Sequence, residues 1–171
     1  MTVNHFTIAR KSADEAERLK IVAAYPIERI SNDPVLTTLV SETAAMFQVP
    51  MTLISIVTEE QQCFPASVGL AVSSTARSIS FCGHAILAEG TMVVPDAQLD
   101  LRFAGNPLVV GTPYVRFYAG ARLLSPENVA IGTLCVIDTI PRPLETFDLQ
   151  GLEEQAQAVM YRLGKLREQW S

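Results

Sequence analysis

The sequence has little basic charge, few cysteines and no long apolar run. Its 13 lysines and arginines are outnumbered by 18 aspartates and glutamates, and the net charge of -5 is spread along the chain. No basic surface is therefore expected to bind nucleic acid or anionic lipid. The longest apolar runs are far shorter than the roughly 18 residues of a membrane span, and the first residues do not form a signal peptide. We expect a cytoplasmic protein that binds neither nucleic acid nor membrane.

The three cysteines, Cys63, Cys82 and Cys135, are widely separated in the sequence. An odd number at such spacing is typical of reduced thiols rather than of a disulfide framework. Cys82, His84, Cys135 and Asp138 could together hold zinc, but no Cys-x-x-Cys pair supports such a site. We therefore assign no metal, and the identity of any cofactor stays open.

The size of the chain predicts one domain. With 171 residues, 49% of them hydrophobic, the chain can form one domain with a sizeable core but is too short for two domains. Residues 1–12 have no clear period and are expected to be flexible or to lie on a partner. We find no internal repeat, low-complexity segment or glycine-rich phosphate loop, so residues 1–171 are treated as a single domain.

A central stretch, residues 77–90, reads RSISFCGHAILAEG. Ser80 is expected to cap a short helix over residues 81–88, and Gly90 to close it in the left-handed conformation. The stretch thus places a thiol and an imidazole at a helix start.

Cys82 lies in the first turn of this helix, where the helix dipole favours a thiolate. Cys82 and His84 are two residues apart and point in different directions, so a Cys-His catalytic pair needs partners from elsewhere. A buried packing cysteine beside a hydrogen-bonded histidine is the competing interpretation.

Three segments in the first two thirds of the chain predict strands. The run 51–57 is apolar and β-branched on both faces, which indicates a central strand covered above and below. Residues 62–68 can return as a second strand, and Pro65 is expected to place that strand at an edge. Residues 92–94 form a short strand that Pro95 ends.

The clearest hairpin joins residues 115–124 to 129–138 through a Ser-Pro-Glu-Asn turn. We expect Leu124 opposite Val129, which gives the two faces different side chains. One face carries Arg116, Tyr118, Gly120 and Arg122 opposite Ile137, Cys135, Thr133 and Ile131, and the other carries Ala119 and Ala121 opposite Leu134 and Gly132. The small face suits close helix packing. The face with Arg116, Tyr118 and Arg122 suits a half-polar cavity. Arginines that simply reach solvent from a strand would explain this pattern equally.

Residues 97–113 are irregular and rich in turn-forming and charged side chains. We expect side-chain hydrogen bonds or salt bridges, rather than the backbone hydrogen bonds of a sheet, to hold this segment in place. The segment can be a lid over a pocket or an ordinary surface loop.

Two longer helices are predicted on either side of the strands. Asp33-Pro34 is a capped helix start, and apolar residues then recur at helical spacing as far as Phe47. Thr146 is expected to cap a C-terminal helix, residues 146–170. Its apolar residues recur in steps of three and four: Leu149, Leu152, Ala156, Val159, Leu163, Leu166 and Trp170. This seam predicts a coiled-coil contact in a homodimer. The alternative is a helix that packs on the core of its own domain, which gives a similar stripe.

Taken together, the motifs resemble the GAF domains of bacterial signalling proteins, as found joined to sensor histidine kinases and diguanylate cyclases. The resemblance covers nearly the whole chain and rests on VPMTLISIV, SFCGHAIL, VVPDA, DLRFAGNP, RFYAGA and IGTLCVID. It implies an α+β fold with a central antiparallel sheet of five or six strands. Terminal helices are expected on one face, and a ligand pocket with short helices on the other.

The sequence departs from several members of that family. Cys63-Phe64 stands where many relatives have Trp-Phe, and Gly83 separates Cys82 from His84, whereas bilin-binding relatives usually have histidine directly after the chromophore cysteine. A covalent bilin is therefore not expected. The three cysteines do not follow the local spacing of the free methionine sulfoxide reductases, which are also GAF domains.

The resemblance implies a sensory or regulatory module that binds an unidentified small molecule and has no catalysis of its own. The terminal helices would relay occupancy within a homodimer or to a signalling partner protein. The residues expected to form the site are Cys82, His84, Asp96, Arg102, Arg116, Tyr118, Cys135 and Asp138. In this site arginines would pair with an anionic group and Tyr118 would form an aromatic wall.

Two other functions are open at this point. One is a thiol redox enzyme or sensor of the free methionine sulfoxide reductase kind, in which Cys82 is the nucleophile and Cys135 or Cys63 resolves it as a disulfide. The other is a dimerisation module whose pocket is vestigial and filled by side chains.

Overall fold

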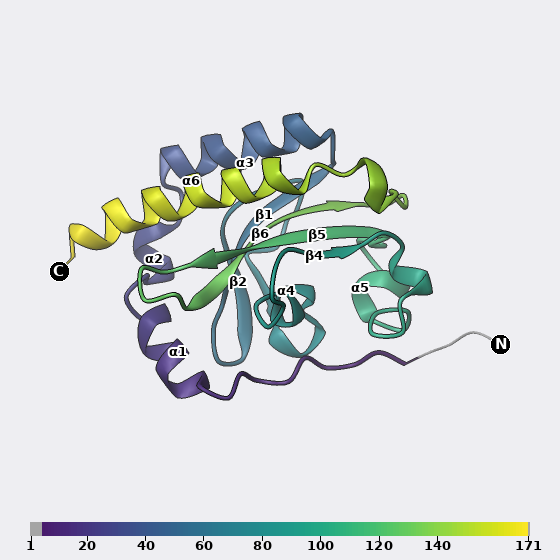
Figure 1. The fold of residues 1–171 in the computed structure, drawn as a ribbon, viewed down its shortest axis with the longest axis horizontal. Helices are drawn as coiled ribbons and strands as arrows, with labels where there is room; N and C mark the ends of the chain where they lie inside the picture. Colours follow the sequence, from purple (N-terminus) through teal and green to yellow (C-terminus); the bar gives the residue numbers. More distant parts are fainter. Residues whose placement is uncertain (1–4, 171) are drawn as a thin grey trace.

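The computed structural model describes residues 5–170, which form a six-stranded antiparallel sheet with helices on both faces (Figure 1). The strands are β1 (Met51–Val57), β2 (Gln61–Val68), β3 (Ser74–Ala76), β4 (Met92–Val94), β5 (Phe117–Leu124) and β6 (Ala130–Asp138). Their order in the sheet is β3-β2-β1-β6-β5-β4. The predicted α+β fold is confirmed, with β1 and the β5–β6 hairpin in the middle of the sheet.

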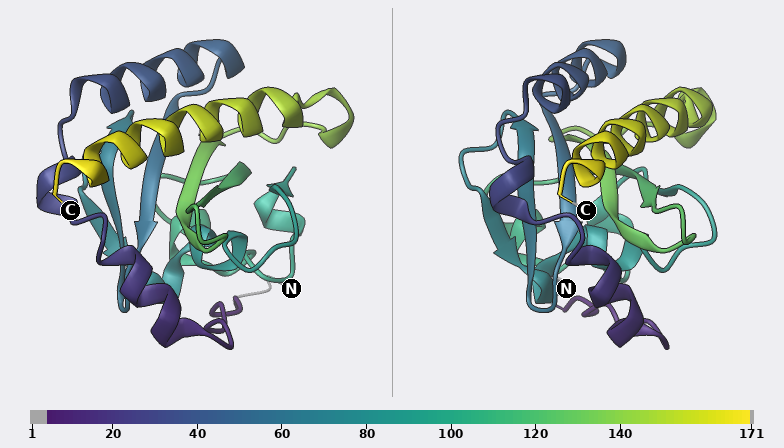
Figure 2. Two further views of the ribbon diagram at one scale, coloured as in Figure 1. Left: turned by 60° about the vertical axis from the view of Figure 1, so that its left-hand side comes forward. Right: turned by 90° about the vertical axis from the view of Figure 1, so that its left-hand side faces the viewer.

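The helices form two layers. The long helices α3 (Pro34–Phe47) and α6 (Leu149–Glu168) lie side by side over one face of the sheet, and the short α4 (Phe81–Ala85) and α5 (Pro107–Val110) lie on the other (Figures 1 and 2). The remaining helices are α1 (Glu15–Val22), α2 (Ile27–Ile30) and the 3-10 turns η1 (Arg77–Ile79), η2 (Ala97–Leu99) and η3 (Leu144–Thr146). Within residues 5–170, no helix is both long and apolar enough to span a membrane.

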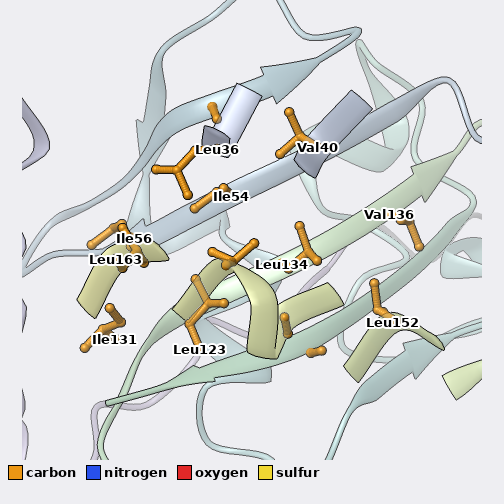
Figure 3. Close-up of a cluster of buried hydrophobic side chains, with 14 of the residues drawn as sticks. Leu36, Val40, Ile54, Ile56, Leu123, Ile131, Leu134, Val136, Leu152 and Leu163 are labelled. Carbon is orange, nitrogen blue, oxygen red and sulfur yellow. The ribbon is translucent and has the colours of Figure 1, made fainter. Parts of the chain in front are cut away.

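The central strands are buried on both faces, so their side chains alternate between two apolar clusters. The helix-side cluster lies between the sheet and α3 and α6 (Figure 3). It includes Leu36, Val40, Ile54, Ile56, Leu123, Ile131, Leu134, Val136, Leu152 and Leu163. The cavity-side cluster, on the opposite face, includes Met51, Leu53, Phe64, Phe81, Cys82, Phe103, Tyr118, Cys135 and Ile137. Every residue of β1 is buried, as its run of apolar and β-branched residues on both faces predicted.

The hairpin keeps the predicted faces but not the predicted register. Tyr118 lies opposite Ile137 rather than Cys135, and Leu124 lies opposite Ala130 after an irregularity in the pairing. A shift of two residues leaves most side chains on their expected face, because the side-chain period of a strand is two. Ile131 is the exception: it joins the helix-side cluster, since the irregularity falls beside it.

The expectations for three elements, β2, α4 and α6, are wrong in part. The first half of β2 is not an edge, because β3 pairs with it from Gln61 to Cys63, and Pro65 lies beyond that pairing. Helix α4 ends at Ala85 instead of residue 88, and among the described glycines only Gly69 has a positive φ, so Gly90 is not a left-handed cap. The cap of α6 is Asp148, whose carboxylate accepts a hydrogen bond from the Gly151 N–H, and not Thr146.

The apolar seam of α6 faces the protein's own sheet. Leu152, Ala156, Val159, Leu163 and Leu166 are buried in the helix-side cluster, and Trp170 packs against it. Only Leu149, at the first turn, is exposed. Small residues on β5, Ala119 and Ala121, belong to the same cluster and let α6 approach the sheet closely. The seam is therefore used within the chain and is not available as a coiled-coil surface.

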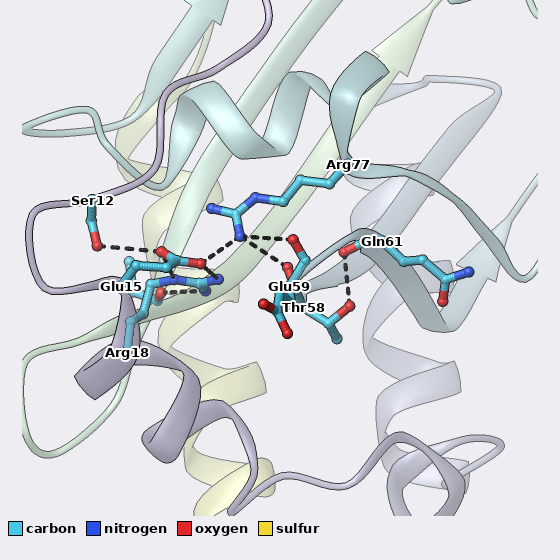
Figure 4. Close-up of polar contacts among 8 residues, drawn as sticks. Ser12, Glu15, Arg18, Thr58, Glu59, Gln61 and Arg77 are labelled. Atoms are coloured by element: carbon cyan, nitrogen blue, oxygen red, sulfur yellow. Dashed lines mark hydrogen bonds and ion pairs between the residues drawn. The ribbon is translucent and has the colours of Figure 1, made fainter.

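The N-terminal segment is attached to the sheet by a buried ion-pair network (Figure 4). Glu15 accepts hydrogen bonds from Arg18 and from Arg77, and Arg77 also donates to the Thr58 carbonyl oxygen at 3.0 Å. Burial raises the pKa of the Glu15 carboxyl, but the hydrogen bonds from the two arginines outweigh it and lower the pKa to about 2. The network joins α1 to η1 and to the β1–β2 turn.

Residues 5–12 form no regular element but contact the body of the protein. The Thr7 N–H donates to the Arg102 carbonyl at 2.9 Å, and the Gly105 N–H donates to the His5 carbonyl at 2.9 Å. The rest of the segment expected to be flexible, residues 1–4, lies outside the described residues. Residues 5–7 therefore run beside the turn region around residues 100–105.

The buried seam generates a stability prediction. Leu163 is 0% exposed, so Leu163→Ala is expected to lower the free energy of unfolding by about 2 to 5 kcal/mol, measured by urea titration. Tyr161→Ala, on the same helix at a side chain 71% exposed, is the matched control and should change it by less than about 0.5 kcal/mol. Replacing Leu163 and Leu166 together by glutamate should unfold the domain. A folded double variant altered only in oligomeric state would contradict this packing.

Candidate functional site

A cavity of about 530 Å³ lies on the face of the sheet opposite α3 and α6. Its lining comes from β1, β2, the loop after β2, β3, α4, the segment around α5, β5 and β6. The lining residues are Met51, Leu53, Gln62, Phe64, Gly69, Leu70, Ala71, Val72, Thr75, Phe81, Cys82, Leu108, Thr112, Pro113, Val115, Tyr118 and Ile137. The volume lies in the range of small-molecule sites, and nearly all of the lining is apolar.

The polar floor of the cavity is a cluster of thiols and hydroxyls. The Tyr118 hydroxyl donates to Cys82 Sγ at 3.2 Å, and the Thr133 hydroxyl donates to it at 3.1 Å. Cys135 Sγ lies 4.0 Å from Cys82 Sγ, and both cysteines are free and buried. These four side chains come from α4, β5 and β6, so the floor forms only when the helix packs on the hairpin.

The environment of Cys82 favours its thiolate. Burial raises the pKa of this thiol, but hydrogen bonds from Cys135, Thr133, Tyr118 and Ser55 together outweigh burial and lower the pKa to about 6. The hydrogen bond to Cys82 and burial raise the pKa of Cys135 well above its ordinary value. Burial likewise raises the pKa of Tyr118. The cluster therefore favours a negative charge on Cys82 over one on Cys135 or Tyr118.

A glycine makes room for Tyr118. A Cβ at Gly120 would lie 2.3 Å from the Tyr118 hydroxyl oxygen, and the tyrosine is only 1% exposed, so its ring cannot move aside. Gly120 therefore allows the ring to lie back along its own strand and reach Cys82. Gly120 is opposite Cys135 in the sheet.

A chain of hydrogen bonds holds α4 and reaches the cavity. The Gly83 N–H donates to Ser80 Oγ at 2.9 Å, which is the predicted N-cap. The Ser80 hydroxyl donates to Gln62 Oε1 at 2.7 Å, and Gln62 Nε2 donates to Thr75 Oγ1 at 2.6 Å. Gln62 and Thr75 also line the cavity. Sequence patterns did not reveal this chain, because its members come from three separate elements.

Of the eight residues expected at the site, the structure brings three together. Cys82 and Tyr118 line the cavity, and Cys135 lies directly behind Cys82. Segment 97–113 contributes Leu108, Thr112 and Pro113 to the cavity wall.

The other five expected residues lie outside the lining. His84 Nε2 is 2.8 Å from the Thr7 carbonyl oxygen, and Asp96 caps η2 by accepting from the Gln98 N–H. The remaining three are engaged locally: Arg102 pairs with Asp100, Arg116 donates to the Val109 and Val115 carbonyls, and Asp138 pairs with Arg142. Among the residues that the structure describes, the cavity therefore has no arginine for an anionic ligand. Across the same residues, no group of three His, Cys, Asp or Glu could hold a metal ion.

The hydrogen bonds to Cys82 predict the order in which the thiols titrate. Only Cys82 should ionise near pH 6, because the pKa values of Cys63 and Cys135 are raised. Thr133→Val removes one donor to the charged sulfur and should raise the pKa of Cys82 by about one unit or more, measured by thiolate absorbance. Cys63→Ser is the control and should leave the ionisation step near pH 6 unchanged.

The same titration fixes the pH dependence of stability. The pKa of Cys82 in the folded protein, about 6, lies below the 9.0 of a free thiol. Between these values the unfolded chain holds a proton that the folded protein does not, so the free energy of unfolding should rise from pH 6 to 9. This gain is lost as the pH falls through 6. Cys82→Ser should flatten that slope, and an equally steep slope in the variant would contradict the assignment.

By sequence, this chain is similar to part of a larger curated protein. No family model matches it. It is 43% identical, over 155 residues and 90% of its length, to a cyclic di-GMP phosphodiesterase of Pseudomonas aeruginosa. The chain spans about a quarter (26%) of the length of that curated relative.

Several solved structures are similar over most of the chain. The free methionine-R-sulfoxide reductase from Neisseria meningitidis, solved with its substrate, is 19% identical with a TM-score of 0.63 and covers 100% of both chains. The chromophore-binding domain of a bacteriophytochrome from R. palustris is 15% identical with a TM-score of 0.63, over 95% of this chain and 65% of that one. The GAF domain of an Acinetobacter phosphoenolpyruvate-protein phosphotransferase is 16% identical with a TM-score of 0.58, over 92% and 95%. At such identities the likeness concerns the fold, and this chain has a GAF-type fold.

Proposed function

We propose that this domain is a sensory or regulatory module that binds a small, largely apolar molecule and has no catalysis of its own. The observation that carries the proposal is the 530 Å³ cavity, whose apolar walls surround a few polar groups. Gln62, Thr75 and Tyr118 supply hydrogen bonds that can orient a ligand, and Phe81 supplies an aromatic surface. A neutral ligand suits this lining better than the anionic one expected from the arginines.

The sheet offers a physical route from the cavity to the terminal helices. Neighbouring residues of one strand face opposite sides: Tyr118 faces the cavity, whereas Ala119 contacts the helix-side cluster. On β6, Ile137 likewise faces the cavity side and Val136 the helix side. A ligand that shifts these strands therefore changes the surface on which α6 packs, because close-packed layers cannot absorb the shift locally.

We further propose that the relay ends in a second copy of the domain or in a signalling partner. The seam of α6 is buried, so a homodimer has to use the outer surfaces of the long helices, where Val35, Met46 and Tyr161 are exposed. The similarity to part of a cyclic di-GMP phosphodiesterase makes an enzyme of cyclic-dinucleotide turnover the first output to test.

The cavity can be tested with the neutral fluorescent probe N-phenyl-1-naphthylamine. Val72 lines the cavity and is 48% exposed, which places it at the mouth. Val72→Trp should fill the mouth without disturbing the core and weaken probe binding by about tenfold, or about 1.4 kcal/mol. Leu99→Trp, at a side chain 81% exposed and outside the lining, is the matched control and should bind like the parent. Absence of saturable binding to the parent would favour a vestigial pocket filled by side chains.

A further inference from the structure

Two cysteine sulfurs meet beneath the cavity without forming a bond. Cys82 Sγ and Cys135 Sγ are 4.0 Å apart, and the residues are 2% and 0% exposed. Cys82 also lines the cavity, whereas Cys135 lies behind it on the central strand β6. A molecule in the cavity can therefore touch Cys82, and only Cys82 can reach Cys135. The third cysteine, Cys63, is half-buried on β2 and has no thiol partner in the described part of the chain.

The two thiols occupy different electrostatic environments. Cys82 accepts hydrogen bonds from two hydroxyls, those of Tyr118 and Thr133, and these stabilise a negative sulfur. Cys135 is placed beside that charge, which keeps its own proton in place. One sulfur is thus prepared as a nucleophile and the other as a protonated partner. Simple packing of two buried cysteines requires neither the donors nor this asymmetry.

We propose that Cys82 and Cys135 form a redox pair that organic hydroperoxides oxidise to a disulfide. The Cys82 thiolate attacks the terminal oxygen of the hydroperoxide, the O–O bond breaks, and Cys82 becomes a sulfenic acid. The alkoxide leaves and takes a proton from solvent, which balances the proton lost when Cys82 ionised. Cys135 then attacks the Cys82 sulfur, the S–O bond breaks, and hydroxide leaves as water with the Cys135 proton.

The cavity selects the class of oxidant. The apolar walls around Cys82, including Leu53, Phe64 and Phe81, can hold the hydrocarbon part of an alkyl or aryl hydroperoxide while its O–O group lies at the sulfur. Hydrogen peroxide gains nothing from these walls, and entering an apolar space costs it hydrogen bonds with water. Organic hydroperoxides should therefore react faster.

The disulfide would join α4 to the middle of the sheet. The sulfurs have to approach by about 2 Å to reach bonding distance. Helix α4 is a single short turn, held at its start by the Ser80 cap, whereas β6 is hydrogen-bonded to strands on both sides. The helix should therefore move toward the strand, which changes the cavity wall.

The experiment uses the whole chain, reduced with dithiothreitol and desalted, and one equivalent of cumene hydroperoxide. After acid quenching, free thiols are alkylated under denaturing conditions and counted by intact mass. The parent should lose two of its three thiols, and peptide mapping without reduction should join Cys82 to Cys135. Dithiothreitol should restore all three. Hydrogen peroxide should give the same product several-fold more slowly.

Single variants separate the roles. Cys63→Ser is the control and should form the disulfide like the parent. Cys135→Ser should stop at a Cys82 sulfenic acid that dimedone traps, and Cys82→Ser should keep both remaining thiols. Val72→Trp keeps every thiol and should slow the organic hydroperoxide alone, which provides a test that does not depend on folding of the cysteine variants.

The inference is overturned if the parent keeps its three thiols, or if oxidation is confined to Cys63 or joins other cysteines. Equal rates for the two oxidants would overturn the assigned substrate class. The inference shares its cavity with the proposed ligand-binding function, but the two fail separately. Probe titration reports occupancy of the cavity, and the thiol count reports chemistry at its floor.

Discussion

The burial of the central strands on both faces is the constraint on which the rest of this structure depends. Each of β1, β5 and β6 sends alternate side chains into the helix-side and cavity-side clusters. Two complete covers are then required, because an uncovered face would expose a row of apolar residues to water. The helices α3 and α6 supply one cover with long regular segments. The other cover consists of short helices and loops, which pack less completely and leave the cavity.

This constraint also explains why the C-terminal helix does not present its seam outward. A helix with a stripe in steps of three and four suits either a partner helix or a sheet, and periodicity cannot distinguish them. The alanines of β5 decide the outcome, because they create a shallow surface within the cluster that α6 packs against. The pattern on the helix alone did not contain that information. Reading it together with the small face of the hairpin would have favoured the sheet.

The fold was largely predictable from local sequence, and the site only in part. The bounds of β1 and β4, the caps at Asp33 and Ser80 and the faces of the hairpin follow from side-chain period and turn chemistry. The charged residues were harder to place. Arg102 and Asp138 pair with neighbours two and four residues away, so each is used locally before it can face a ligand.

The groups that do reach the cavity are held by partners far away in sequence. Gln62 lies 18 residues before Ser80, and Thr133 lies 51 residues after Cys82. Such pairs depend on the strand order β2-β1-β6-β5, which short-range patterns do not reveal. Family resemblance supplied the fold and the general position of the pocket. It could not supply these partners, because they depend on the residues specific to this chain.

Gln62 would connect the proposed ligand binding with the proposed chemistry of Cys82. Its amide lines the cavity and accepts the hydrogen bond of Ser80, the residue that caps α4. A ligand that hydrogen-bonds to Gln62 therefore competes with the cap, and a loosened cap lets the first turn of α4 move. Cys82 lies in that turn, where its distances to Thr133 and Tyr118 determine how well its charge is stabilised. In the other direction, a disulfide that draws α4 toward β6 pulls on the same cap and displaces the amide from the cavity wall. If both proposals hold, occupancy and oxidation act on one short helix and, by linkage, each alters the equilibrium of the other.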